Sequence, residues 1–241
     1  MVAAAGVLCV AVAALAAVDP GAGVAPRMEF TPPRAGSYVL QKIQPIADAT
    51  LLDAAGKPTR LAVATTGRIT LLTFFYTYCA DPLGCPFAYH TLTEVRRGVV
   101  EDTRLARRVR FLSVSLDPTT DTPEAIGRYR EMVMRDSTME WNVLTARSVR
   151  ALLPVLEDFG QDVSVERGPD GTPRRALHHM LKMFLIDQSG VVREIYTLAY
   201  LQPEVILNDI RTLYLEERSR DRKSTRLNSS HSELARMPSS A

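Results

Sequence analysis

The chain has little net charge and few sulfur atoms. Its formal net charge is only +2 over 241 residues, and residues 221–241 hold four of the basic side chains. No stretch combines a basic stripe with interleaved aromatic residues, which argues against nucleic acid as a partner. Only three cysteines occur, at positions 9, 79 and 85, and none forms a Cys-x-x-Cys pair. The hydrophobic content of 46% is enough for an ordinary core, and we expect one folded domain.

The first residues lack charged side chains altogether. Residues 2–18 are apolar and precede Asp19-Pro20-Gly21, a pattern typical of a signal sequence or membrane anchor, which residues 1–18 would form. The basic residues that usually precede such a segment are missing, and its length does not separate cleavage from anchoring. Residues 19–36, rich in Pro, Gly and Ala, predict a flexible tether. We therefore expect a periplasmic or otherwise extracytoplasmic protein, held at the membrane through residues 2–18.

The end of the chain is polar and carries no predicted function. Residues 221–231 and 236–241 resemble a translated sequencing-library adapter more than a protein segment. We expect the folded domain to span residues 37–217, and residues 218–241 to form a disordered tail of that origin.

An apolar run leads directly to two neighbouring cysteines. Residues 69–78 are rich in Leu, Phe, Tyr and Thr and predict a buried strand, and Pro82 with Gly84 predicts a turn. Cys85 then takes the N-cap position of a helix whose first residue is Pro86. A helix N-terminus carries unpaired amides and partial positive charge, which favour a thiolate over a thiol. Two such sulfurs, one loop apart, can close a disulfide or hold a soft metal.

Strands and helices alternate along the domain. Apolar periodicity and turn residues predict strands at residues 38–40, 49–53, 69–78, 109–116, 141–144, 180–186 and 191–196. Helical spacing and capping residues predict helices at residues 86–99, from residue 122, at residues 146–159 and at residues 203–215. This order indicates an α/β, thioredoxin-like fold: a central mixed sheet flanked by helices, with an N-terminal strand extension.

Several short motifs together resemble the Sco/SenC family, thioredoxin-fold copper proteins that serve cytochrome c oxidase assembly. They are Thr-Tyr-Cys-Ala-Asp at 77–81 with Cys85-Pro86, Ser-Val-Ser-Leu-Asp-Pro at 113–118, Asp-Thr-Pro-Glu at 121–124, and His179 six residues before Leu185-Ile186-Asp187. The resemblance covers about residues 38–215. It departs in one place, because five residues separate Cys79 from Cys85 where the family has three.

The resemblance implies a copper site formed by Cys79, Cys85 and His179. Two thiolates suit Cu(I), and an added imidazole nitrogen allows Cu(II) to be held as well. It also implies a Cys79–Cys85 disulfide in the oxidised metal-free form. The expected partners are a copper-receiving protein, such as a cytochrome c oxidase subunit, and a thiol reductant. On this interpretation the protein is an exported copper metallochaperone.

Other functions remain open from the sequence. The same two cysteines could serve a thiol-disulfide oxidoreductase that acts on client proteins without metal. A regulatory redox sensor or a simple stabilising disulfide is also compatible with them. The absence of Cys-x-x-Cys and the presence of His179 favour the metal site.

Four further side chains are candidate ligands: His90, His178, Met180 and Met183. Adjacent strand residues point to opposite faces, so only one of His178 and His179 can meet the cysteine loop, and the spacing to residues 185–186 selects His179. His90 is expected on a solvated helix position. Met180 and Met183 have soft thioethers, but their apolar surroundings predict core packing for both.

Overall fold

The computed structural model describes residues 28–133 and 139–234. Its elements are β1 (Gln44–Pro45), β2 (Thr50–Leu52), β3 (Pro58–Arg60), α1 (Leu61–Thr65), β4 (Ile69–Phe75), α2 (Cys85–Glu101), α3 (Thr103–Ala106), β5 (Val109–Ser115), α4 (Pro123–Val133), β6 (Trp141–Leu144), α5 (Val149–Asp158), β7 (Val163–Arg167), β8 (Pro173–His179), β9 (Lys182–Ile186), β10 (Val191–Thr197), the 3-10 helix η1 (Leu198–Tyr200) and α6 (Pro203–Leu234). The predicted membrane segment and residues 19–27 of the tether lie outside the described ranges. Within those ranges no helix is long and apolar enough to cross a membrane.

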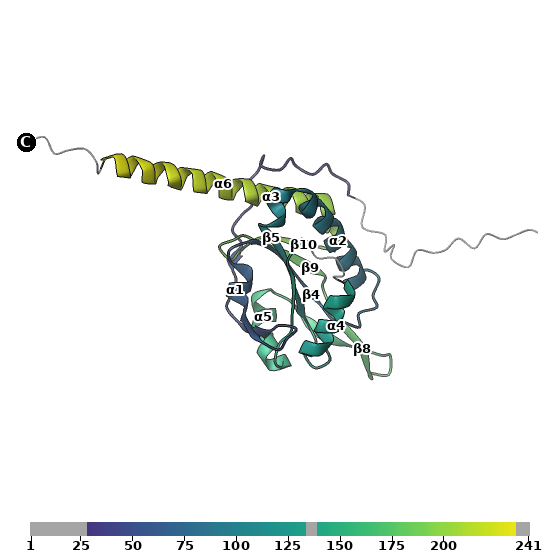
Figure 1. Ribbon diagram of the computed structural model, residues 1–241. Helices are drawn as coiled ribbons and strands as arrows, with labels where there is room; N and C mark the ends of the chain where they lie inside the picture. The colour runs from purple at the N-terminus through teal and green to yellow at the C-terminus, as the bar shows by residue number, and fades with distance from the viewer. Residues whose placement is uncertain (1–27, 134–138, 235–241) are drawn as a thin grey trace, which may run out of the picture.

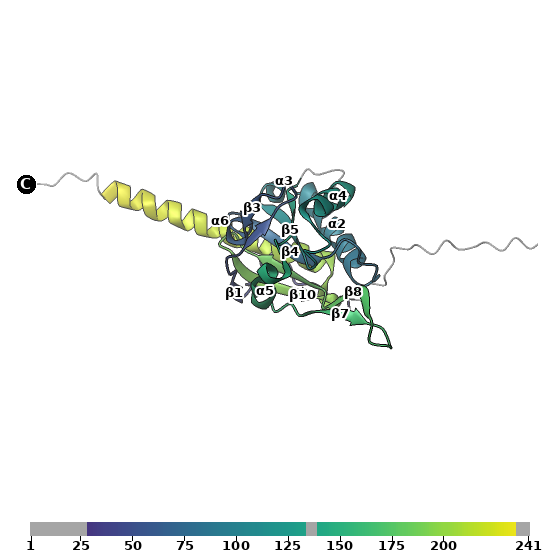
Figure 2. The same cartoon turned by 90° about the horizontal axis from the view of Figure 1, so that it is seen from below.

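Six strands form the central sheet, in the order β1-β10-β9-β4-β5-β6. Strands β4, β5 and β6 are parallel, whereas β9, β10 and β1 are antiparallel to their neighbours. Every residue of β4 and β5 is buried, because helices cover both faces: α2 and α4 lie on one side and α5 on the other (Figures 1 and 2). The predicted thioredoxin-like α/β fold is confirmed.

The register of β4 and β5 determines which loops meet. Phe75 at the end of β4 pairs with Ser115 at the end of β5. The segment after β4 carries Cys79, and the segment after β5 leads to Asp121. Because parallel strands end at the same edge of a sheet, these two segments lie side by side.

Helix α6 packs against α2 and continues well past the domain. A Cβ on Gly98 of α2 would lie 2.6 Å from Leu207 Cδ1 of α6, so glycine permits this close helix contact. The sequence predicted the end of this helix near residue 215 and a disordered tail from residue 218. In the structure the helix runs to Leu234 and projects from the body of the domain (Figure 1).

The predicted strand at residues 38–40 is wrong. Leu40 is buried as an apolar residue should be, but the backbone there joins no sheet. The buried guanidinium of Arg193 donates to the carbonyl of Leu40 and, through Nε at 3.1 Å, to that of Gln41. These acceptors are therefore already used, and the edge strand β1 forms only at Gln44–Pro45.

The hairpin of β7 and β8 was not predicted. The segments on either side of residues 168–171 pair with each other, from Val163 opposite His179 to Arg167 opposite Pro173. The hairpin projects from the domain (Figure 2). Both strands are largely exposed, so they lack the apolar alternation that identifies a half-buried strand. The hairpin carries His179 at its end.

Candidate functional site

The loop between β4 and α2 is attached to the neighbouring strand through one buried carboxylate. Asp121 accepts hydrogen bonds from the Thr77 amide, at 3.2 Å to Oδ2, and from the Thr77 hydroxyl. Its Oδ2 also accepts from Ser115 Oγ at 2.6 Å. Burial raises the pKa of Asp121, although these hydrogen bonds oppose the rise. The carboxylate therefore ties the start of the cysteine loop to the end of β5.

The rest of the cysteine loop turns outward between fixed ends. Tyr78 donates its hydroxyl proton to Asp117 Oδ2 at 2.7 Å. Asp81 closes a turn, since its side chain accepts from the Leu83 amide at 3.0 Å and its carbonyl from the Gly84 amide at 2.9 Å. Leu83 is 42% exposed at the tip. The loop is thus held near its start and at its end, and its middle faces solvent.

The loop brings the two cysteines together at the start of α2. Cys85 is the first residue of the helix and Gly84 is its N-cap, one position earlier than the sequence predicted. The Cys85 amide donates to Cys79 Sγ at 3.5 Å. A Cβ on Gly84 would lie only 3.1 Å from that sulfur, so glycine lets the helix start close to it. Both cysteines are free thiols, Cys79 half-buried and Cys85 only 8% exposed.

The pKa values of the two thiols are shifted in opposite directions. A hydrogen bond from the Cys85 side chain is the main cause that lowers the pKa of Cys79 to about 5, with help from the Cys85 amide and from Tyr76. The same hydrogen bond, together with burial, raises the pKa of Cys85 far above its ordinary value. Near neutral pH the pair therefore holds one proton, with Cys79 as thiolate and Cys85 as its donor.

His179 approaches the same place from the hairpin. Its Nδ1 lies 3.3 Å from the carbonyl oxygen of Met180, which favours the tautomer with a proton on Nδ1 and a free electron pair on Nε2. Burial lowers the pKa of His179, so the imidazole is neutral near pH 7. A neutral imidazole with a free Nε2 is the form that binds metals.

Tyr76 links the hairpin to the cysteine loop, and the sequence did not single it out. Its hydroxyl donates a hydrogen bond to the carbonyl of Leu177 on β8 and accepts one from the amide of the same residue, each at 3.4 Å. Its ring stands edge-on to the His179 imidazole at 6.0 Å between centroids. The hydroxyl also hydrogen bonds Cys79, and burial is the main cause that raises the pKa of Tyr76. Tyr76 thus contacts both the hairpin that carries His179 and the loop that carries Cys79.

Cys79 and His179 line a common cavity of about 360 Å³. The exposed His178 also lines it, although we expected only one histidine to reach this side. Met180 corrects a second expectation: Met183 is fully buried as predicted, but Met180 is 60% exposed and belongs to the cavity wall. Met180 lies in the two-residue connection between the end of β8 and the start of β9 and is not part of the predicted strand at residues 180–186.

The structure brings the three predicted ligands only partly together. Cys79 contacts Cys85 and shares the cavity with His179. Across the described ranges, no three His, Cys, Asp or Glu side chains stand close enough together to hold a metal ion. His90 lies exposed on α2, as expected of a solvated helix position.

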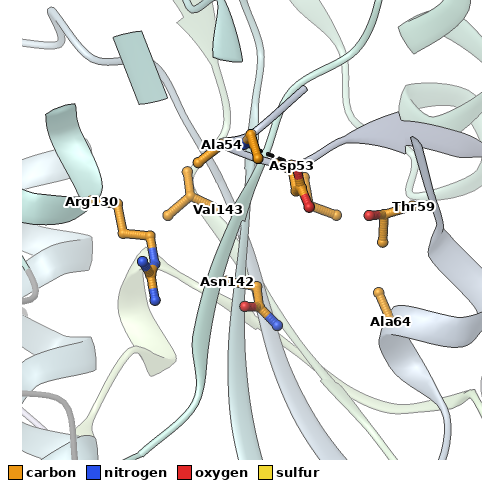
Figure 3. A pocket seen from close by; sticks show the side chains of 9 residues that line it. Asp53, Ala54, Thr59, Ala64, Arg130, Asn142 and Val143 are labelled. Carbon is orange, nitrogen blue, oxygen red and sulfur yellow. Dashed lines mark hydrogen bonds between the residues drawn. The ribbon is translucent and has the colours of Figure 1, made fainter. Parts of the chain in front are cut away.

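A second cavity, of about 350 Å³, lies beside the edge strand β6 (Figure 3). The carboxylate of Asp53 in its wall accepts hydrogen bonds from the amides of Ala55 and Lys57, both at 2.9 Å, and so stabilises the turn that follows Asp53. Thr59, Arg130 and Asn142 are the other polar residues of the wall (Figure 3). The cavity includes neither cysteine nor His179.

The fold is similar to that of solved Sco proteins. Arabidopsis thaliana ScoI with copper bound matches with a TM-score of 0.59 at 18% identity, over 70% of this chain and 98% of that chain. Bradyrhizobium japonicum ScoI with copper bound matches with a TM-score of 0.54 at 23% identity, over 68% and 96%. BsSco, a member of the Sco family of cytochrome c oxidase assembly proteins in which a disulfide switch was identified, gives 0.56 at 19%, over 73% and 98%.

The sequence itself gives the family. No curated protein sequence matches the chain. The SCO1/SenC family model matches residues 42–215, which include both cysteines of the loop, His179 and the whole central sheet. The chain therefore belongs to the SCO1/SenC family.

Proposed function

We propose that this protein is a copper metallochaperone that binds the ion through Cys79, Cys85 and His179 and passes it to a subunit of a respiratory copper enzyme such as cytochrome c oxidase. The observation that carries the proposal is the contact of Cys79 Sγ with the Cys85 amide beside a cavity that His179 also lines. Family membership and the copper-bound relatives support the choice of metal. Membership of BsSco among oxidase assembly proteins supports the choice of client.

The donor set fits copper as a cargo. Two sulfurs suit Cu(I), and the imidazole of His179 makes Cu(II) acceptable. Cys79 is already a thiolate, whereas Cys85 must release its proton before its sulfur can bind. One ion held by all three side chains requires His179 and the cysteine loop to come closer than they are here. Release to a client then proceeds by exchange of one ligand at a time.

The redox state of the pair controls loading in this proposal. A disulfide between Cys79 and Cys85 removes both thiolates, so the oxidised form has to be reduced by a thiol reductant before copper can bind. The half-exposed Cys79 is the sulfur that such a reductant can reach.

The site of action in this proposal is outside the cytoplasm, with residues 2–18 as the membrane anchor. Support comes from their uncharged, apolar composition. Fusion of residues 1–36 to a reporter that is active only after export, compared with the same reporter lacking residues 2–18, tests this placement. Equal reporter activity in both would contradict it.

Copper titration of the reduced chain tests the ligand set. Cu(I) affinity is measured by competition with a chromophoric chelator, and Cu(II) binding by the thiolate-to-copper absorption band. We expect Cys79→Ser, Cys85→Ser and His179→Ala each to weaken binding and perturb the band, while His90→Ala, which removes an exposed histidine of α2, leaves both unchanged. Native affinity in His179→Ala would exclude the three-ligand site.

The unequal acidities of the two thiols favour a second candidate, a thiol-disulfide oxidoreductase. The Cys79 thiolate would attack a client disulfide, forming a mixed disulfide and releasing one client thiolate. Cys85 would then lose its proton and attack Cys79 Sγ, which releases the second client thiolate and leaves the Cys79–Cys85 disulfide. Two electrons pass to the client. Turnover of a disulfide substrate without copper, fully retained in His179→Ala, would favour this function over the metallochaperone.

A further inference from the structure

Met180 presents its side chain to solvent from a fixed backbone. Its carbonyl oxygen accepts a hydrogen bond from Gln161 Nε2 at 2.9 Å, and His179 Nδ1 lies 3.3 Å from the same oxygen. Gln161 is itself buried, so this backbone segment is held against the domain. The Met180 side chain is nevertheless 60% exposed. The thioether of Met180 is therefore open to a ligand that enters the cavity whose wall it belongs to.

The thioether of Met180 completes a set of soft donors around one cavity. The cavity wall contains Cys79, His179 and Met180, whereas Cys85 is 8% exposed and lines a different, inner cavity of about 10 Å³ with Tyr89. A copper ion that arrives from solvent therefore meets the first three side chains before it reaches Cys85. A thioether is a soft ligand that suits Cu(I) and has no proton to release.

We propose that Met180 is an additional copper ligand, which holds Cu(I) together with Cys79 and His179 at the cavity while the ion enters or leaves. The inference rests on the copper function proposed above and adds a fourth side chain to it. Cys85 then joins the ion as a further sulfur donor while the thioether stays bound. Met180 thereby lets the cargo remain bound while a stronger ligand is exchanged. Because a thioether prefers Cu(I), its contribution is confined to the reduced ion.

The test compares two equally exposed methionines. Met180→Leu removes the thioether with little change of volume, and Met132→Leu makes the same change on α4, where Met132 is 62% exposed outside the cavity. We expect Met180→Leu in the reduced chain to lower Cu(I) affinity by about tenfold, a loss within the range found when groups around a metal site are removed. Cu(II) affinity stays unchanged, and Met132→Leu binds both ions as the native chain does.

A direct readout is the methyl resonance of each methionine in a chain labelled with ¹³C at the methionine methyl groups. On addition of Cu(I), the Met180 signal, assigned by its loss in Met180→Leu, shifts while the Met132 signal does not. Unchanged Cu(I) affinity in Met180→Leu together with an unmoved Met180 resonance overturns the inference. If Cys79→Ser and His179→Ala still weaken binding in that case, the proposed function stands without Met180. A native chain that fails to bind Cu(I) at all overturns both.

Discussion

Glu217 is a buried acid with one carboxylate oxygen that lacks a hydrogen bond within the part of the chain that the structure describes. It lies on α6 and is only 6% exposed, and its Oε1 has no hydrogen-bond partner among the described residues. Burial is the main cause that raises its pKa from 4.5 to about 7; the charge of Asp187 adds to the rise, while the backbone of Gln188 and the cation of Arg108 oppose it. Glu217→Gln keeps the shape of the side chain and removes the charge.

The sign and size of the effect follow from proton linkage. The folded carboxyl binds its proton more tightly than the unfolded one, so this group's contribution to stability is complete below about pH 4.5 and is lost as the pH rises to about 7. A tenfold change in proton affinity is worth about 1.4 kcal/mol, so the difference between 4.5 and about 7 sets an upper limit of about 3 kcal/mol. Glu217→Gln should therefore be more stable than the native chain at about pH 8, by up to that amount, and gain little at about pH 4.

Urea unfolding at the two pH values measures this difference. The chain has a single tryptophan, the buried Trp141 of β6, whose fluorescence reports loss of the core. Comparison of variant and native chain at each pH isolates Glu217 from other acids with raised pKa values, such as Asp121 and Asp209. The exposed Glu157→Gln on α5 is the control and should change stability equally little at both. The reasoning is refuted if Glu217→Gln is no more stable than the native chain at about pH 8, or if its gain in stability is the same at both pH values.

Three shorter predictions concern the core and the cysteine loop. Leu71→Ala, in the fully buried centre of β4, should cost about 2–5 kcal/mol of unfolding free energy in the same urea assay. Asp121→Ala leaves the groups of Thr77 without their acceptor, which should cost about 1–3 kcal/mol and speed hydrogen exchange at the Thr77 amide. In the reduced chain, the rate of Cys79 alkylation by iodoacetamide should rise with pH with a midpoint near pH 5. Cys85→Ala should move that midpoint upward, because the hydrogen bond from Cys85 is the main cause of the low pKa of Cys79.

Elements with a strong local pattern could be predicted from the sequence. The apolar run of β4 is buried on both faces, and Pro86 fits only the first turn of a helix, so the boundary that carries the cysteines was placed to within one residue. The hairpin of β9 and β10 follows from two apolar segments joined by a short turn that ends in Gly190, whose φ of +80° favours glycine.

Features that depend on contacts between distant segments could not be predicted. The role of Asp121 needs the parallel pairing of β4 with β5, and the failure of a strand at residues 38–40 needs a guanidinium that lies more than a hundred residues later. Met180 is another case. The sequence places it within one apolar strand, whereas in the structure it lies in the two-residue connection between β8 and β9 and lines the cavity.

The length of the cysteine loop is compatible with a paired site because hydrogen bonds hold the loop at both ends. Thr77 is held by Asp121, and Gly84 begins the helix that presents Cys85 to Cys79. Between them, Asp81 closes a turn and its backbone helps to lower the pKa of Cys79, while Leu83 is exposed. Five intervening residues therefore do not separate Cys79 from Cys85. In the copper function proposed above, the longer loop should change the exposed surface around Leu83 and leave the contact between Cys79 and Cys85 in place.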